Sequence, residues 1–239
     1  MKGVALVTGA GRGLGPILAT FLAGQGHKIV ITARTFTELH DVAQSLESTG
    51  VTVVAIPGDI TDPVHRTRLL QQTRAIGGLS LLVNNASDLG EIPRPELALA
   101  SLQRFRLTLE TNLVAPIALI QESLPQLEQS RGLVVNISSD ASQGGYEHWG
   151  IYGSSKAALD LASKTLAAEL KPRHISVVSV DPGDMRTRMH QDAFPGEDIS
   201  DRPLPEVTLP FWAWLVSQNP ERITGMRYHA QGTLWEIPA

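Results

Sequence analysis

Six aliphatic runs alternate with segments of helical periodicity, and this alternation constrains the fold more than any other feature of the sequence. The runs VALVT, HKIVITA, VTVVAIPGD, LSLLVNNAS, GLVVNISS and HISVVSVDPG begin at residues 4, 27, 51, 79, 132 and 174. Continuous Val, Ile and Leu without polar alternation is typical of strands buried on both faces, as in parallel sheets. The sequence therefore predicts an α/β fold: a doubly wound parallel sheet of about seven strands with helices on both faces, in one domain over residues 1–239.

Helix signals fill most of the intervals between these runs. They span residues 15–26, 35–50, 62–78, 96–129 and 152–172, and within 96–129 we expect Pro116 and Pro125 to mark a kink or helix ends. Residues 182–206 are rich in proline, glycine and charge and too long for a plain connection. We therefore expect a functional loop there, a substrate loop over about 183–206.

Composition and charge exclude several kinds of site and partner. The chain has no cysteine, which excludes disulfides, thiolate metal sites and a cysteine nucleophile. The seven histidines show no metal-ligand spacing, and no G-x-S-x-G elbow indicates a serine hydrolase, so we expect no metal. The net charge of -4 gives no reason to expect nucleic acid or an anionic membrane. Without a signal peptide or a long apolar run, the expected location is cytoplasmic.

The glycine-rich turn TGAGRGLG, Thr8 to Gly15, follows the first predicted strand and precedes the first predicted helix. Glycines there let the backbone approach a phosphate, while the helix N-terminus supplies N–H donors. The turn is no P-loop, because no lysine occurs between Gly3 and His27. Its spacing is T-G-x-x-x-G-x-G, with glycines at positions 9, 13 and 15, instead of G-x-G-x-x-G. A glycine-rich tight turn without a ligand is the alternative.

Charge near the second predicted strand bears on the choice of cofactor. An NAD site usually places Asp or Glu about 20 residues after the turn. Twenty residues after Gly13 stands Ala33, followed by Arg34, so no carboxylate stands there. Arg34, with Arg12 in the turn, can instead pair with a 2′-phosphate, which favours NADP(H) over NAD(H). The alternative is that Arg34 is a solvated loop residue.

The stretch YGSSK places Tyr152 and Lys156 one helical turn apart on the same helix face. Such a pair can be a solvated polar stripe. It can also be a phenol beside an ammonium that lowers the phenol pKa from its usual value near 10.

With the glycine turn and this pair, the sequence resembles the classical short-chain dehydrogenase/reductase family over nearly its whole length, which implies a Rossmann-type, NAD(P)-binding domain. Asp59 matches the residue that usually meets the adenine, and NNAS, residues 84–87, matches N-N-A-G except at Ser87. Further matches, in family order, are Asn112, Ser139 thirteen residues before the tyrosine, the Y-x-x-x-K pair, and DPGDMRT with Pro182, Gly183 and Thr187.

The resemblance implies two sets of site residues. The catalytic set is Asn112, Ser139, Tyr152 and Lys156. The cofactor set is Thr8, Gly9, Arg12, Gly13, Leu14, Gly15, Arg34, Asp59, Ile60, Asn85, Ala86, Tyr152, Lys156, Pro182, Gly183 and Thr187.

By the same resemblance, Tyr152 exchanges a proton with the substrate oxygen while hydride moves between substrate and nicotinamide. Lys156 hydrogen-bonds the nicotinamide ribose and tunes the tyrosine, Ser139 binds the substrate oxygen, and Asn112 holds a water that links Lys156 to solvent. Each residue has a plainer alternative: Ser139 can be a turn or capping serine with Ser138 acting in its place, Asn112 a helix cap or kink, and Lys156 an exposed helix lysine. Their co-occurrence favours the catalytic interpretation.

The substrate is less constrained. Candidate pocket residues are largely apolar or aromatic, which favours a neutral carbonyl compound or alcohol of small or medium size. They are Gln143, Tyr146, Trp149, Met185, Met189 and Phe194. Arg186 and Arg188 can bind a carboxylate, or they are solvated loop residues.

Two alternative functions and the oligomeric state are not decided by the sequence. A 3-oxoacyl-type reductase and a non-catalytic NADP(H)-binding regulator are the alternative functions. The C-terminal segment has the family's T-G but lacks its D-G-G ending. We expect a homodimer or homotetramer.

Overall fold

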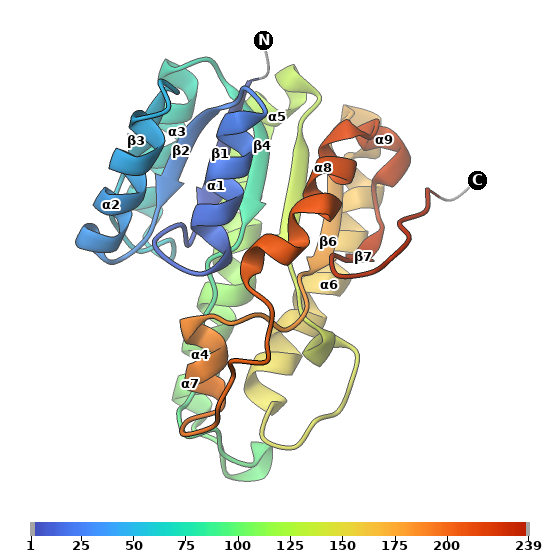
Figure 1. Cartoon of the computed structure of the whole chain (residues 1–239). Helices are drawn as coiled ribbons and strands as arrows, with labels where there is room; N and C mark the ends of the chain where they lie inside the picture. Colours follow the sequence, from blue (N-terminus) through green and yellow to red (C-terminus); the bar gives the residue numbers. More distant parts are fainter. Residues whose placement is uncertain (1–2, 238–239) are drawn as a thin grey trace.

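The central sheet has seven parallel strands in the order β3-β2-β1-β4-β5-β6-β7 (Figure 1). The computed structural model describes residues 3–237. The strands are β1 Val4–Thr8, β2 Lys28–Thr32, β3 Val53–Ala55, β4 Leu79–Asn84, β5 Leu133–Ile137, β6 Ser176–Asp181 and β7 Arg227–His229. The predicted doubly wound, Rossmann-type sheet is confirmed, and its seventh strand comes from the C-terminal segment, which carried no clear strand signal.

Nine α-helices surround the sheet within the described residues 3–237. They are α1 Leu14–Gly24, α2 Phe36–Glu47, α3 Pro63–Ala75, α4 Leu102–Leu109, α5 Ala115–Ser130, α6 Gly150–Leu170, α7 Arg188–Ala193, α8 Leu209–Ser217 and α9 Pro220–Ile223. Local chemistry sets several of their ends. The Asp62 carboxylate caps α3 by accepting from the Val64 N–H at 2.8 Å, with Pro63 as the first helical residue.

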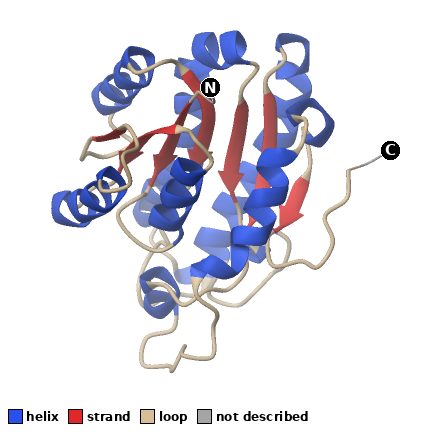
Figure 2. Cartoon of the chain, turned by 45° about the horizontal axis from the view of Figure 1, so that its top comes forward, coloured by secondary structure: helices blue, strands red, loops and turns tan. Residues whose placement is uncertain are grey.

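Side chains of successive strand residues pack on opposite faces of the sheet. Ala5 and Val7 of β1 pack in the cluster that includes α1, α2 and α8, whereas Val4 and Leu6 pack against α3, α5 and α6. Helices cover both faces in Figure 2 as well. This two-residue period explains why the strands read as continuous aliphatic runs, because each face of the sheet is buried.

The predicted helical stretch 96–129 is divided by a π-helical turn, Glu110–Val114, which joins α4 to α5. Pro116 lies in the first turn of α5, where its missing N–H is tolerated, and Pro125 lies inside the helix without ending it. π-helical turns inside helices often occur at functional sites. Asn112, a predicted site residue, lies in this turn.

The loop predicted over about 183–206 is only partly irregular. It contains α7, whose N-terminus is capped by Thr187: the Thr187 hydroxyl accepts from the His190 N–H at 3.2 Å. The segment returns over the carboxyl ends of β5 and β6 (Figure 1). Within residues 3–237, none of the helices has the length and apolar character that crossing a membrane requires.

The sheet order reverses between β1 and β4, because the chain passes outward to β2 and β3 before returning to β4 beside β1. At such a switch point the loops after the two strands separate, and ligands of doubly wound folds bind in the crevice between them. The glycine turn follows β1, and Asn85 and Ala86 follow β4.

Candidate active site

Two adjoining cavities open at the carboxyl ends of the strands. The first extends from the glycine turn along β2 and β4 to α6, and the second lies beside it under α7. Tyr152 lines both cavities. The other shared lining residues are Ser138, Pro182, Met185, Thr187 and Met189.

The glycine turn is packed so closely that side chains are excluded from it. A Cβ atom on Gly15 would lie 2.3 Å from the Gly9 carbonyl oxygen, and one on Gly9 would lie 2.7 Å from the Ala86 Cα atom. Gly9 and Gly13 also have positive φ angles, 65° and 68°. The Asn85 side chain ties the turn to β4 by donating to the carbonyl oxygens of Thr8 and Gly9, both at 3.0 Å.

The exposed backbone of this turn and the N-terminus of α1 fit the diphosphate of a dinucleotide, since they combine close backbone approach with free N–H donors. Most predicted cofactor residues line the first cavity: Gly9, Arg12, Gly13, Leu14, Arg34, Asp59, Ile60, Asn85, Ala86, Tyr152, Lys156, Pro182 and Thr187. Thr8 and Gly15 do not line this cavity. The Thr8 hydroxyl accepts from the N–H groups of Asn85 and Ala86, and Gly15 packs against the Gly9 carbonyl oxygen. Gly183 lines the second cavity.

Asp59 lines the first cavity, and the buried His65 lies behind it. Burial raises the pKa of Asp59, but hydrogen bonds from the Thr61 N–H and hydroxyl and the positive charge of Arg34 outweigh it, so the pKa is lowered overall. His65 Nε2 lies 2.7 Å from the Thr32 hydroxyl, and burial lowers the His65 pKa. His65 could not be recognised from the sequence, because a histidine within α3 belongs to no motif.

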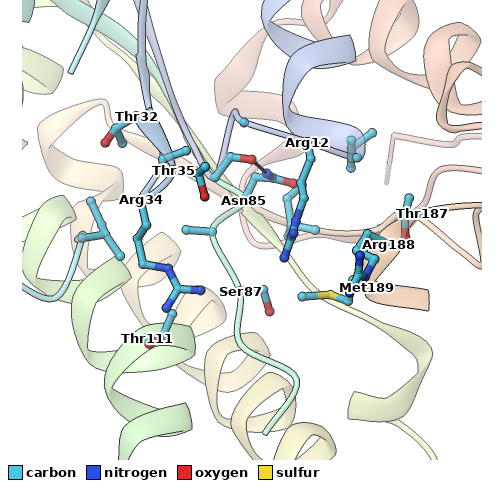
Figure 3. Close-up of a pocket in the computed structure, with 18 of the residues that line it drawn as sticks. Arg12, Thr32, Arg34, Thr35, Asn85, Ser87, Thr111, Thr187, Arg188 and Met189 are labelled. Atoms are coloured by element: carbon cyan, nitrogen blue, oxygen red, sulfur yellow. Dashed lines mark hydrogen bonds between the residues drawn. The ribbon is translucent and has the colours of Figure 1, made fainter. Parts of the chain in front are cut away.

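Three arginines lie in the same cavity. Figure 3 shows Arg12 and Arg34 extending into it, with Arg188 of α7 across from them. No carboxylate stands at the end of β2, where the sequence has Ala33 and Arg34, but one reaches the cavity from the next helix. The first turn of α2 brings Glu38 into the cavity wall, where its Oε1 atom lies 3.7 Å from Arg12 Nη1. Spacing from the glycine turn missed Glu38 because the helix, and not the strand end, carries it.

Lys156 is buried at 2 % exposure, so its interpretation as an exposed helix lysine is wrong. Its Nζ atom donates to the Ile137 carbonyl oxygen at 2.7 Å and lies 5.5 Å from the centroid of the Tyr152 ring. Burial lowers the Lys156 pKa to about 8, although the negative charges of Asp160 and Asp181 act to raise it.

Tyr152 is also buried, and the expectation that its pKa falls is wrong. Burial raises the pKa to about 12, because it disfavours the phenolate, and the charges of Asp181 and Asp140 act in the same direction. Side-chain hydrogen bonding with Ser87 and Ser139 opposes this rise. Tyr152 is therefore protonated at neutral pH and able to donate a proton.

Ser139 has two sets of contacts. Its hydroxyl donates to the Asp140 carboxylate at 2.9 Å and accepts from the Ala141 N–H at 3.2 Å, which caps a single helical turn, Asp140–Ser142. The same side chain interacts with Tyr152 and lines the second cavity. Ser139 is therefore a capping serine, and its contact with Tyr152 and the second cavity also leaves it placed to bind a substrate oxygen. The buried Ser138 lies 3.4 Å from the Ser142 hydroxyl.

The Asn112 carboxamide fixes the loop that follows β4. Its oxygen accepts from the Asp88 N–H at 2.7 Å, and its nitrogen donates to the Asp88 carbonyl oxygen at 2.8 Å and to the Ser155 hydroxyl at 2.9 Å. The Ser87 hydroxyl donates to the same oxygen at 3.3 Å. Ser87 also hydrogen-bonds Tyr152, and its one signal in the sequence is that it stands where the family motif has glycine.

The second cavity is lined mainly by apolar and aromatic side chains, including the predicted Tyr146, Trp149, Met185, Met189 and Phe194. Gln143 does not line it. Its Nε2 atom instead donates to the Ser142 hydroxyl at 3.1 Å. Arg186 is engaged by the carbonyl oxygens of Ser200 and Arg202. A residue that the sequence analysis missed, Arg94, packs over Trp149 at the edge of this cavity.

The sequence model of the short chain dehydrogenase family matches residues 3–198. The uncharacterized oxidoreductase YciK of Escherichia coli (strain K12) is 32% identical over 234 residues, which cover 95% of this chain and 91% of YciK.

Solved structures agree. A short chain dehydrogenase from Shigella flexneri, complexed with NADP, superposes with a TM-score of 0.89 at 30% identity, covering 97% of this chain and 98% of that one. The KRED1-Pglu enzyme superposes with a TM-score of 0.83 at 33% identity, covering 95% of this chain and 100% of that one.

The family match, the similarity along nearly the full chain, and the cavities at the sheet's switch point lead to one conclusion. This chain belongs to the short-chain dehydrogenase family and is an oxidoreductase.

Proposed function

We propose that the protein is an NADP(H)-dependent oxidoreductase that interconverts a carbonyl compound and a secondary alcohol. The observation that carries this proposal is the position of Tyr152, which lines both cavities and is protonated at neutral pH. A proton donor at the junction serves a reaction between a molecule in one cavity and a molecule in the other.

The first cavity is the proposed cofactor site. The glycine turn would hold the diphosphate, Asp59 the adenine, and Arg12 with Arg34 the 2′-phosphate, because two guanidinium groups complement a dianion. Two structural relatives at 30% identity, from Shigella flexneri and Escherichia coli CFT073, were solved with NADP and NADPH respectively, which supports this cofactor.

When bound, the nicotinamide supplies a hydride in the reductive direction and accepts one in the oxidative direction. In reduction, Tyr152 donates its proton to the substrate oxygen. Ser139 hydrogen-bonds the same oxygen and stabilises the charge that develops there. The Lys156 ammonium, held by the Ile137 carbonyl, stabilises the phenolate that remains. In oxidation, the same groups act in reverse.

The second cavity is the proposed substrate site. Its Met, Trp and Phe side chains favour a neutral carbonyl compound, and Arg186 is held by backbone carbonyls outside it. A 3-oxoacyl-type reductase remains the specific alternative, and a non-catalytic regulator the alternative of another class.

The test combines a carbonyl screen with one substitution. Purified protein is assayed for NADPH oxidation with aldehydes, ketones, diketones and 3-oxoacyl thioesters, and Tyr152→Phe is compared by turnover and by NADPH binding calorimetry. We expect turnover to be lost and NADPH affinity to change less than about threefold, since the phenyl ring keeps its packing. Turnover at the wild-type rate in Tyr152→Phe contradicts the mechanism. NADPH binding without turnover of any carbonyl supports the regulator.

The cytoplasmic location and a homodimer or homotetramer also stay predictions. Exposed apolar side chains on the connected elements α4 to α6 support self-association: Leu102, Leu107, Val114 and Leu161. Light scattering of the purified protein tests the assembly.

A further inference from the structure

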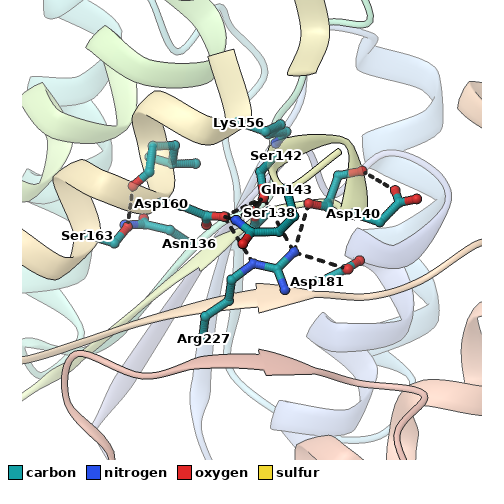
Figure 4. A network of polar contacts seen from close by, with 12 residues as sticks. Asn136, Ser138, Asp140, Ser142, Gln143, Lys156, Asp160, Ser163, Asp181 and Arg227 are labelled. Atoms are coloured by element: carbon teal, nitrogen blue, oxygen red, sulfur yellow. Dashed lines mark hydrogen bonds and ion pairs between the residues drawn. The ribbon is translucent and has the colours of Figure 1, made fainter. Parts of the chain in front are cut away.

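Arg227, on the edge strand β7, joins three segments at the proposed active site, two of which carry proposed catalytic residues. Its Nε atom donates to Asp160 Oδ2 at 3.0 Å, and its Nη2 atom donates to the Ser139 carbonyl oxygen at 2.8 Å and to Asp181 Oδ2 at 3.2 Å (Figure 4). Asp160 lies on α6, Ser139 is the second residue after β5, and Asp181 ends β6. No motif of the sequence analysis includes Arg227.

The two carboxylates that Arg227 contacts are buried. Asp160 and Asp181 are 4 % and 3 % exposed, and Asp160 Oδ2 also accepts from the Ser142 hydroxyl at 2.5 Å. The Asp160 Oδ1 atom is buried without a hydrogen-bond partner among the described residues. Buried carboxylates are costly unless a cation compensates them, and Arg227 is the guanidinium that contacts both.

The same carboxylates face Lys156. Asp160 lies one helical turn beyond Lys156 on α6, and its negative charge, like that of Asp181, favours the Lys156 ammonium. Lys156 and Arg227 therefore supply two positive charges against two buried negative ones. The charged groups that act on the Lys156–Tyr152 pair come from α6, the turn after β5, and β6: Asp160, Asp140 and Asp181. Arg227 of β7 reaches the pair only through its contacts with Asp160 and Asp181.

We propose that Arg227 is a positioning residue for the reaction: its guanidinium fixes the Ser139 backbone beside Tyr152 and neutralises the two carboxylates that face Lys156. This inference rests on the proposed function for the roles of Ser139, Tyr152 and Lys156. The charge balance that it describes can be measured without turnover.

The two roles of Arg227 separate in different variants. Arg227→Gln leaves the carboxylates uncompensated, which raises the pKa of Lys156, because added negative field favours the ammonium. Asp160→Asn removes one negative charge and therefore lowers the Lys156 pKa. The double variant restores the balance and brings the pKa back toward the wild-type value. Arg227→Lys keeps the charge but lacks the forked donor geometry, so it weakens the anchor on Ser139 and leaves the Lys156 titration nearly unchanged.

The Lys156 titration is read by NMR of protein labelled with ¹³C at the lysine Cε atoms. The chain has five lysines, at positions 2, 28, 156, 164 and 171, and the spectrum of Lys156→Met identifies the Lys156 signal. We expect the Lys156 pKa to shift upward by roughly one pH unit in Arg227→Gln and downward by about as much in Asp160→Asn. The pH limit of kcat should move in the same directions, and kcat of Arg227→Lys should fall roughly tenfold at constant KM.

Arg173→Gln is the matched control. Arg173 pairs with Glu128 at 2.8 Å on the surface, in the turn that follows the end of α6 at Leu170. The part of α6 from Lys156 to its end spans about 20 Å, so the loss of Arg173 should move neither the titration nor kcat. If the Lys156 pKa shifts in the same direction in Arg227→Gln and Asp160→Asn, or shifts in neither variant, the proposed charge balance is wrong. If Arg227→Gln does not fold, the charge balance is tested by the other two variants: the Lys156 pKa should fall in Asp160→Asn and stay unchanged in Arg227→Lys. Wild-type protein that turns over no carbonyl defeats the proposed function, whereas the Lys156 titration still tests the balance.

Discussion

The guanidinium of Arg94 lies 3.7 Å above the centroid of the Trp149 ring. The same group lies 5.0 Å from the Phe194 ring centroid, and its Nη2 atom donates to the Ala193 carbonyl oxygen at 2.6 Å. Arg94 precedes α4, Trp149 precedes α6, and Ala193 ends α7, so one side chain fastens α7 beside the second cavity. Burial lowers the pKa of Arg94, although the charge of Glu197 opposes this.

Replacing Arg94 by Leu should therefore loosen α7 and weaken substrate binding. Cation–π contacts contribute about 0.5–2 kcal/mol, so we expect KM for the carbonyl substrate to rise by roughly threefold to thirtyfold with a smaller change in kcat. Steady-state kinetics measures both. Arg74→Leu, on an exposed arginine in the last turn of α3, is the control and should leave KM unchanged. An unchanged KM in Arg94→Leu would show that α7 holds its position without this contact.

Two glycines of α1 should respond oppositely to alanine. At Gly15 a Cβ atom would lie 2.3 Å from the Gly9 carbonyl oxygen, so Gly15→Ala must shift the backbone and should destabilise the protein by about 1–3 kcal/mol. At Gly24 nothing lies within 4 Å, and Gly24→Ala should be neutral or stabilise by up to about 1 kcal/mol. Urea unfolding measures both, and equal midpoints would contradict the packing argument. Gly15→Ala should also lose NADPH affinity.

Glu38 and Arg34 should affect cofactor choice in opposite directions. Glu38→Gln removes a negative charge beside Arg12 in the cofactor cavity, so NADPH should bind about threefold to tenfold more tightly while NADH changes little. Arg34→Asp should weaken NADPH relative to NADH. Calorimetry with both nucleotides measures the two ratios. A preference for NADH in the wild-type protein would contradict the assignment of Arg34 to the 2′-phosphate.

The buried ammonium of Lys156 should make stability depend on pH. Its folded-state pKa of about 8 lies below the ordinary 10.5, so between these values the unfolded chain binds more protons and stability rises with pH. Below pH 8 the buried charge costs about 3 kcal/mol, and Lys156→Met should be the more stable protein. Its advantage should shrink as the pH rises to 10.5. Urea unfolding at pH 7 and pH 10 checks this, and a pH-independent difference would contradict it.

The pH dependence of catalysis should show the same group. Because Lys156 must carry its proton to stabilise the Tyr152 phenolate, kcat for reduction should fall as the pH rises through about 8. A pH–rate profile with saturating NADPH measures this limit. A reductive rate that stays flat through pH 9 would indicate that Lys156 acts without its charge.

The local parts of this protein were determined by sequence patterns. Aliphatic runs gave the first six strands because burial on both faces removes polar alternation, as Val4 and Ala5 on opposite faces show. The glycine turn was recognisable because its close packing admits no Cβ atom at Gly9 or Gly15. The spacing of Tyr152 and Lys156 was informative because a helix places them on one face.

Only the tertiary structure decided what surrounds those residues. Burial, which no motif encodes, reverses the expected shift of the Tyr152 pKa and brings that of Lys156 to about 8. Glu38, Arg94 and Arg227 enter the site from segments without a motif, because chain folding and not spacing brings them there. Interactions within one turn or one strand depend on residues that are close in the sequence, so the sequence predicts them. Desolvation and long-range charge pairs depend on segments that meet only in the folded chain.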